Sequence, residues 1–220
     1  MNGQGPGEKD GGAEGGVPGH ADGQHDPLTG LPNRRLLAHD LDAAIRDFQR
    51  NRMPFTVLYV DLDDFKPVND TFGHGTGDRV LQQIARRLRQ GGRDADTFAR
   101  IGGDEFVGLL RSTESIEGAT VIARRLRASL EEPLVVEDQL LRIGASIGIA
   151  LYPEHGGDAA SLIDAADWAM YRAKRSHSGI AVPEADRASA AERDFVLATT
   201  FEQVRREDRI HLQFQPQFPL

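Results

Sequence analysis

The chain has 220 residues, of which 39% are hydrophobic and 27% charged, a composition typical of a soluble globular protein with one ordinary domain and tails. Its net charge of -8 argues against a general nucleic-acid-binding protein, which needs a basic face, although a local basic pocket for a nucleotide remains compatible with it. The absence of cysteine excludes disulfides and thiolate metal sites. Because we find neither a membrane-spanning apolar run nor a signal-peptide core, we expect a cytoplasmic protein.

The first 24 residues consist mostly of glycine, with proline, acidic residues and glutamine between. Such a segment buries too little apolar surface to offset the entropy lost on ordering. We therefore expect a disordered leader over residues 1–24 and ordered structure from about residue 25.

The next part of the chain alternates helical and strand patterns. Apolar spacing over residues 36–48 predicts a helix that ends before Pro54, and residues 55–60 (FTVLYV) predict a buried strand. A glycine-rich loop is expected over residues 73–77. Asp78 then fits the N-cap of a second helix, whose apolar side spans residues 80–88.

A hairpin follows. Residues 97–101 and 106–110 predict two strands, and the paired glycines between them suit a tight turn that needs a positive φ. Helices are expected over residues 114–130 and 158–174, with strands near 134–136 and 140–151. This order predicts an α/β (α+β) fold with a mixed central sheet covered by helices.

Three acids stand at the ends of predicted strands. Asp61 follows the buried strand, and Asp104 and Glu105 lie in the hairpin turn. If the strands are neighbours, these carboxylates converge at one edge, where Mg²⁺ could be held with help from phosphate oxygens. Paired ions can hold the attacking and leaving oxygens of a displacement at phosphorus. Taken singly, each acid fits a solvated strand end or hairpin tip, and the pattern alone does not name a reaction.

Several polar residues between the acids suit a nucleotide. Lys66 could contact phosphate, although a lone lysine is usually only solubilising. Asn69 and Asp78 could read a guanine edge, but they equally fit a turn residue and a helix cap. His74 lies among glycines and would otherwise be a loop histidine without a role.

Five ordered segments together resemble the diguanylate cyclases of the GGDEF family. The resemblance covers about residues 25–183 and implies a palm-like fold, like that of nucleotide cyclases, with a GGDEF β-hairpin. It also implies condensation of two GTP into cyclic di-GMP plus pyrophosphate. The segments are DPLTGLPNRR (26–35), DLDDFKPVNDTFGHGTGD (61–78), GGDEF (102–106), ASIGIALYP (145–153) and ADWAMYRAK (166–174).

The resemblance carries roles to individual positions. It implies that Asp61, Asp104 and the backbone carbonyl of Leu62 bind Mg²⁺, with Mn²⁺ as the alternative ion. Asp104 and Glu105 would assist deprotonation of the attacking ribose 3′-hydroxyl. The remaining assignments are guanine recognition by Asn69 and Asp78, triphosphate contacts by Lys66 and Lys174, and positions beside the substrate for His74, Gly102 and Gly103.

The family's chemistry also implies partners. One domain holds one GTP, so two domains must face each other in a homodimer. Arg93 and Asp96 match in place the RxxD motif at which cyclic di-GMP inhibits family members, and Arg125 could belong to the partner side of that site. A surface turn with an ordinary ion pair is the simpler alternative.

Two features depart from an isolated active cyclase. Ser178 stands where family members often carry an arginine four residues after the lysine of the last motif; Arg175 could compensate. Residues 184–220 are expected to hold a linker helix (192–206) and a strand (210–214), and HLQFQPQFPL (211–220) resembles the opening of an EAL phosphodiesterase domain. The EAL signature itself is missing, so we expect no hydrolysis.

Two further hypotheses therefore remain beside the cyclase. The first is a non-catalytic module that binds GTP or cyclic di-GMP and regulates an adjoining EAL domain. The second is an inert fragment that neither binds ligand nor unfolds cooperatively.

Overall fold

The computed structural model describes residues 23–113 and 115–183. The predictions for residues 1–22 and 184–220, including the helix and strand expected near the C-terminus, lie outside the described residues. The elements follow one another as α1 (Arg34–Asn51), β1 (Phe55–Asp63), α2 (Phe65–Phe72), α3 (His74–Gly91), β2 (Thr97–Gly102), β3 (Glu105–Arg111), α4 (Ile116–Glu131), β4 (Leu134–Val136), β5 (Gln139–Leu141), β6 (Gly144–Tyr152), α5 (Ala159–Ser176) and β7 (Ile180–Ala181).

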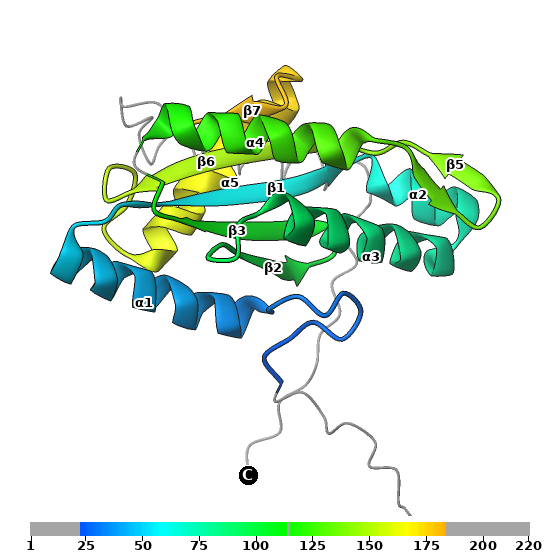
Figure 1. Ribbon diagram of the computed structural model, residues 1–220. Coiled ribbons are helices and arrows are strands. Elements are labelled where there is room, and N and C mark those ends of the chain that lie inside the picture. The colour runs from blue at the N-terminus through cyan, green and yellow to red at the C-terminus, as the bar shows by residue number, and fades with distance from the viewer. Residues whose placement is uncertain (1–22, 114, 184–220) are drawn as a thin grey trace, which may run out of the picture. The chain divides into compact units, whose positions relative to one another are not determined.

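A mixed sheet forms the centre of the fold, in the strand order β2-β3-β1-β6-β7 (Figure 1). The pairs among the first four strands are antiparallel, and β7 pairs parallel to β6. β1 is therefore bonded on both sides, to β3 and to β6, over most of its length. Strands β4 and β5 form a separate two-stranded sheet. The predicted mixed sheet covered by helices is confirmed.

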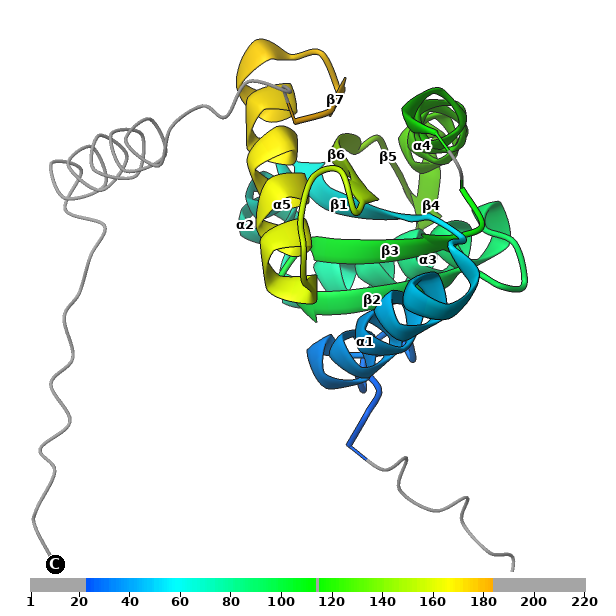
Figure 2. The ribbon, with the colours of Figure 1, turned by 90° about the vertical axis from the view of Figure 1, so that its left-hand side faces the viewer.

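Helices cover both faces of this sheet. Alternate residues of β1 point to opposite sides, and the apolar side chains on both sides are buried under helices. Leu58, Val60 and Leu62 belong to a core shared with α3 and α4, whereas Val57 and Tyr59 belong to a core shared with α1 and α5. Figure 2 shows α4 and α5 on opposite sides of the sheet. None of the helices in the described residues is both long enough and apolar enough to cross a lipid bilayer.

The loop predicted over residues 73–77 is wrong. The chain forms α2 directly after β1, and α3 begins at His74, so Asp78 lies inside α3 and is not its N-cap. The physical reason is packing: Gly77 is buried against the side chain of Asn69 on α2, which a side chain at this position would prevent. Gly77 therefore serves a helix–helix contact and not a loop.

The strand predicted over residues 140–151 is also wrong in its extent. Gln139–Leu141 pairs with β4, and a separate strand, β6, begins at Gly144. The two-residue strand β7 is too short for a periodic pattern to reveal it. At the hairpin, Gly103 has a φ of +42°, as the turn prediction required.

Gly148 tests how closely α5 packs on β6. A Cβ at this position would overlap the backbone of Ala166 and Met170 in α5. We expect Gly148→Ala to lower the free energy of unfolding by about 1–3 kcal/mol, as overpacking does. Urea denaturation measures this, with Gly157→Ala as the control, since nothing lies within 4 Å of a Cβ added there. Equal midpoints for the two variants would contradict the close packing.

Candidate active site

The acids predicted to converge do lie together at one end of the sheet. Asp61 on β1 lies directly opposite Glu105 on β3, and both are partly buried. The backbone N–H of Leu62 donates to the carbonyl of Asp104 at 3.3 Å, which ties the hairpin turn to the end of β1. Strand register thus places three carboxylates from two separate motifs in one site.

Lys174 joins this group from α5. Its Nζ donates to Oδ1 of Asp61 in a hydrogen-bonded ion pair. Burial alone would lower the pKa of Lys174, but this hydrogen bond and the charges of Asp61, Asp63 and Asp104 together raise it. The ammonium group therefore partly neutralises the acids.

The carboxylates are nevertheless poorly compensated. Burial raises the pKa of Asp61, and the charges of Asp104 and Glu105 raise it further against the opposing effect of Lys174. The pKa of Asp167 on α5 is raised to about 6, first by burial and then by Glu105, Asp164 and Asp61. A site with this excess of partly buried negative charge favours a cation.

Two members of the site were missed from the sequence. Asp167 lies seven residues before Lys174 and so shares its face of α5, a spacing that could have pointed to it. The hydroxyl of Tyr59 lies within hydrogen-bonding reach of Glu105, and the pKa of Tyr59 is raised by burial and by the charges of Asp167 and Glu105. Its place in a buried strand gave no signal of a polar contact.

The donor set fits a hard divalent cation that arrives with phosphate. Among the residues that the structure describes, no group of three or more His, Cys, Asp or Glu side chains could hold a metal ion by itself. Asp61, Asp104 and the carbonyl of Leu62 supply oxygen atoms, as Mg²⁺ requires, and Mg²⁺ commonly takes only one or two carboxylates beside substrate oxygens.

A second group of predicted residues lies on α2 and α3. Asn69 is partly buried against Gly77, and Asp78 follows Gly77 on the exposed side of α3. Lys66 lies in the first turn of α2 and His74 is the first residue of α3; both are exposed. The structure thus brings Asn69 and the start of α3 together.

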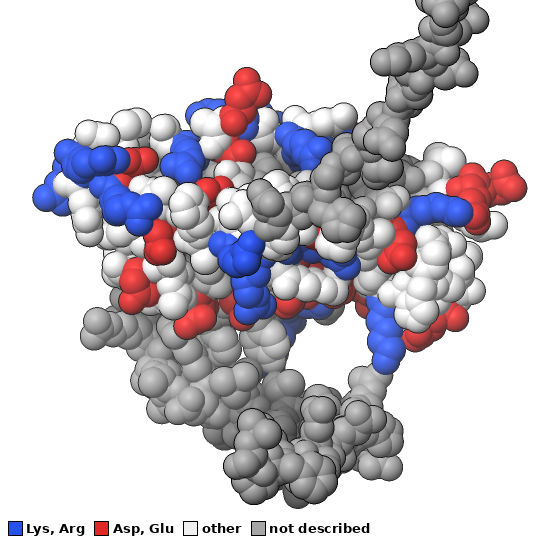
Figure 3. All heavy atoms as spheres, turned by 90° about the horizontal axis from the view of Figure 1, so that it is seen from below, with Lys and Arg blue, Asp and Glu red and all other residues white. Residues whose placement is uncertain are grey.

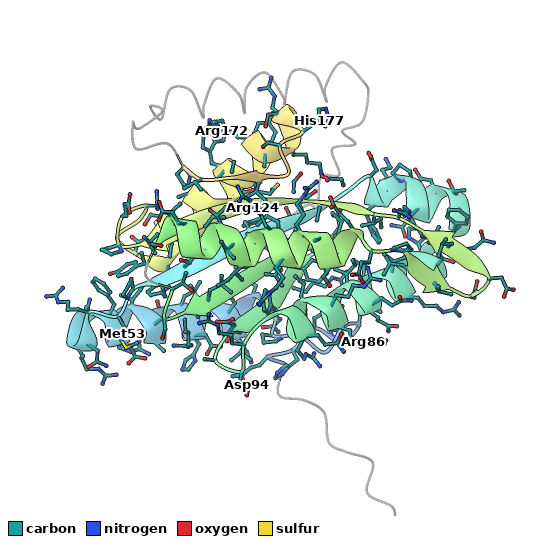
Figure 4. The ribbon with its side chains drawn as sticks, turned by 45° about the horizontal axis from the view of Figure 1, so that its top comes forward. Met53, Arg86, Asp94, Arg124, Arg172 and His177 are labelled. Carbon is teal, nitrogen blue, oxygen red and sulfur yellow. The ribbon has the colours of Figure 1, made fainter. Side chains whose placement is uncertain are left out.

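The RxxD turn between α3 and β2 is held by its own aspartate. The carboxylate of Asp96 accepts from the backbone N–H of Arg93 at 2.9 Å and from that of Arg111 at 3.1 Å. Nη2 of Arg125 donates to the carbonyl of Gly91 at 2.8 Å, so this arginine reaches the same turn from α4 of its own chain. A hollow of about 380 Å³ lies here, lined in part by Arg93 and Asp96. Figure 4 shows Asp94 at the tip of the turn.

Ser178 takes a structural place after α5. Its hydroxyl donates to the carbonyl of Ile180 and lies 3.0 Å from that of Ser176. The guanidinium of Arg175 lies 5.8 Å from the ring centre of Tyr171.

An ion pair that sequence reasoning missed supports the hairpin turn. Nη1 of Arg100 donates to both carboxylate oxygens of Asp26, at 2.9 and 3.1 Å. Nε and Nη2 of the same guanidinium donate to the carbonyl of Gly103, at 3.0 and 2.8 Å. The side chains of Arg100 and Asp26 are only 15% and 13% exposed. Arg100 thus joins the segment before α1 to the turn that carries Asp104.

The family model "Diguanylate cyclase, GGDEF domain" matches residues 23–179. The chain belongs to the GGDEF domain family. It is 41% identical over 193 residues to the bifunctional diguanylate cyclase/cyclic di-GMP phosphodiesterase MucR of Pseudomonas aeruginosa, covering 87% of this chain but only 28% of that protein.

Two solved GGDEF domains resemble this one closely. The GGDEF domain of TpbB (YfiN) from Pseudomonas aeruginosa is 43% identical with a TM-score of 0.71, over 74% of this chain and 95% of that one. The GGDEF domain of DgcB from Caulobacter crescentus, in complex with c-di-GMP, is 27% identical with a TM-score of 0.69, over 74% of this chain and 98% of that one.

The Asp26–Arg100 pair makes the stability of this GGDEF domain depend on pH. Burial alone would raise the pKa of Asp26, but the hydrogen bonds from Arg100 and Thr29 and the charge of Arg100 hold it below the ordinary value of 3.8. Because the pKa of Asp26 is lowered in the folded state, the carboxylate stabilises the fold at pH values above 3.8. This contribution is lost as the pH falls from 3.8 through the folded-state pKa. We expect Asp26→Asn to cost about 1.5–3 kcal/mol at neutral pH.

Urea denaturation at neutral pH and at a pH well below 3.8 measures both effects. The difference in free energy of unfolding between wild type and Asp26→Asn should shrink in acid. Protonated Asp26 no longer carries the negative charge that pairs with Arg100. Asp42→Asn, an exposed change on α1, is the control and should have little effect at either pH. An equal loss at both pH values would contradict this account.

Proposed function

We propose that this GGDEF domain is a diguanylate cyclase, which condenses two GTP into cyclic di-GMP and pyrophosphate across a homodimer. The observation that carries the proposal is the convergence of Asp61, Asp104 and Glu105 beside Lys174 at the end of β1. The cyclase activity in the printed names of its relatives supports it. The chain spans only about a third of the length of these relatives, 28% of one and 36% of the other.

In this proposal Asp61, Asp104 and the carbonyl of Leu62 hold Mg²⁺ or Mn²⁺ together with the triphosphate. When bound, the ion neutralises phosphate charge and favours ionisation of the 3′-hydroxyl. Asp104 and Glu105 accept the hydroxyl proton, since both lie at the hairpin turn beside Asp61. Lys174, freed from Asp61 as positive charge arrives, contacts the triphosphate.

The remaining roles follow from α2 and α3. Lys66 lies at the start of α2, where a point charge and a helix N-terminus both favour phosphate. Asn69 and Asp78 recognise the guanine edge, and His74 lies beside the substrate. Gly102 and Gly103 carry no side chains, so a nucleotide can approach the backbone of the hairpin turn at these two residues.

A homodimer is part of the proposal because one domain supplies one half of the site. Each 3′-oxygen must reach the α-phosphorus of the other GTP, which positions the two domains face to face. Positioning and charge neutralisation then account for most of the rate gain.

The test of activity uses the full chain fused to a dimerising coiled coil. With GTP and Mg²⁺ it should form cyclic di-GMP, detected by chromatography. Asp104→Asn should lower the rate by about 10²–10⁴-fold, because the base and a cation ligand are lost together. Circular dichroism should show an unchanged fold, so that the loss is chemical. Absence of product from the wild-type dimer would overturn the cyclase.

Gly77 tests guanine recognition separately from the chemistry. A Cβ at Gly77 would overlap Oδ1 of Asn69, whereas nothing lies within 4 Å of one added at Gly75 on the same helix. We expect Gly77→Ala to weaken GTP binding about tenfold, the worth of roughly one hydrogen bond, and Gly75→Ala to leave it unchanged. Calorimetry with GTP and ATP measures this. Equal affinities for GTP in the two variants would remove Asn69 from the guanine site.

Inhibition by the product is a further part of the proposal. Arg93, Asp96 and Arg125 meet at the turn between α3 and β2, and the related DgcB domain was solved in complex with c-di-GMP. Because both oxygens of Asp96 already accept backbone hydrogen bonds, Arg93 would supply the main contacts to phosphate and guanine.

The second candidate is a non-catalytic module that binds GTP or cyclic di-GMP and regulates an EAL domain. The bifunctional name of MucR and the serine at position 178 favour it. GTP binding without product in the dimer would select it. We also propose domain limits of 25–183 and a cytoplasmic location. A disordered leader over residues 1–24 and an EAL-like start within 184–220 are part of the same proposal.

A further inference from the structure

A basic groove lies beside the hairpin turn, against the start of α1. It has a volume of about 470 Å³, and its walls include Arg34, Arg35, Arg100 and the backbone of Gly102 and Gly103. Asp26 is the only carboxylate among its lining residues. Figure 3 shows basic and acidic side chains interspersed over the face that carries α1. In a chain with a net charge of -8, a groove with this excess of arginine favours an anion.

The arginines of the groove differ in their hydrogen-bond and ion-pair partners. Arg100 already donates to Asp26 and Gly103 and is largely buried. Arg34, the first residue of α1, is exposed, and no carboxylate among the residues that the structure describes lies within ion-pair distance of it. A planar guanidinium in this position can bind phosphate through paired hydrogen bonds.

The charge of Arg34 also acts on the group that contains the proposed catalytic acids. Its charge lowers the pKa of Tyr59, whose hydroxyl lies within hydrogen-bonding reach of Glu105. Gly102 and Gly103 line the groove, and Asp104 and Glu105 follow them directly in the chain, so the groove and these acids share the same two-glycine turn. Nothing lies within 4 Å of a Cβ added at Gly102 or Gly103, so the turn leaves open space between them.

The chemistry of the proposed function requires an anion here. A 3′-oxygen beside Asp104 and Glu105 attacks the α-phosphorus of the other GTP and must approach it to about 3–3.5 Å. The new O–P bond forms as the bond from the α-phosphorus to its bridging oxygen breaks. The hydroxyl proton passes to a carboxylate, and pyrophosphate leaves with the bonding electrons. The other GTP's phosphates therefore lie next to this turn, outside the site of the domain's own GTP.

We propose that the groove receives the α- and β-phosphates of the GTP carried by the facing domain, with Arg34 as their principal contact. This inference rests on the proposed function, and it assigns Arg34 to the partner's nucleotide while Lys66 and Lys174 serve the domain's own. Charge on the leaving pyrophosphate grows as the bond breaks, so Arg34 acts most strongly in the transition state.

The experiment compares Arg34→Gln with Arg46→Gln. Arg46 is an exposed arginine on the same helix, about 18 Å further along. Product formation is measured with the full chain fused to a coiled coil. Nucleotide affinity and self-association are measured with the unfused full chain, using a GTP analogue with a methylene group between the α- and β-phosphorus, which cannot release pyrophosphate.

Arg34→Gln should lower kcat by about 10–100-fold, the scale of losing one transition-state contact, and should abolish tighter self-association in the presence of the analogue. It should leave the analogue's affinity for the dilute, monomeric chain unchanged. Arg34→Lys should restore part of kcat, and Arg46→Gln should match the wild type throughout.

Other outcomes overturn the proposal. Weaker analogue binding to the monomer would assign the groove to the domain's own nucleotide, and unchanged kcat and self-association would leave it without a nucleotide. If the wild-type dimer forms no product, the cyclase itself fails. The analogue-dependent association of wild type and Arg34→Gln then still decides whether the groove binds a nucleotide from the facing domain.

Discussion

The register of β1 is the constraint on which the rest of the structure depends. This strand is bonded to β3 on one side and β6 on the other, so Asp61 lies opposite both Glu105 and Ser146. A slip by one residue would turn Asp61 toward α3 and α4 and move the core side chains of β1 to the wrong face of the sheet. Both sheet faces are buried under helices, which makes such a slip very unfavourable. A rigid core thus places the carboxylates.

That placement concentrates negative charge in a partly buried site. The raised pKa values of Asp61 and Asp167 record the unfavourable interaction, and the ion pair of Asp61 with Lys174 relieves only part of it. A cation that brings its own phosphate ligands would complete the neutralisation without a dedicated protein cage. In the proposed function the site binds cation and nucleotide together, and Lys174 passes from carboxylate to phosphate.

The sequence predicted local structure well where burial produced a regular period, as in α1, α5, β1 and the hairpin. It also predicted the convergence of Asp61, Asp104 and Glu105, because a strand end and a tight turn restrict where such residues can lie. It failed where the cause was a contact between separate elements: Gly77 suggested a loop until its contact with Asn69 of α2 was known. Asp26 and Arg100, 74 residues apart, gave no local signal of their ion pair.

The contact between Asp26 and Arg100 connects the start of the fold to the candidate site. One guanidinium joins the segment before α1 to the carbonyl of Gly103, and Asp104 is the next residue. A shift of that segment would therefore move the turn that carries Asp104, the proposed catalytic base. Arg34 begins α1 directly after the same segment, so the proposed contact to the facing nucleotide and the support of the turn would move together. Correct approach of a second domain would then position the acid as well as the phosphate.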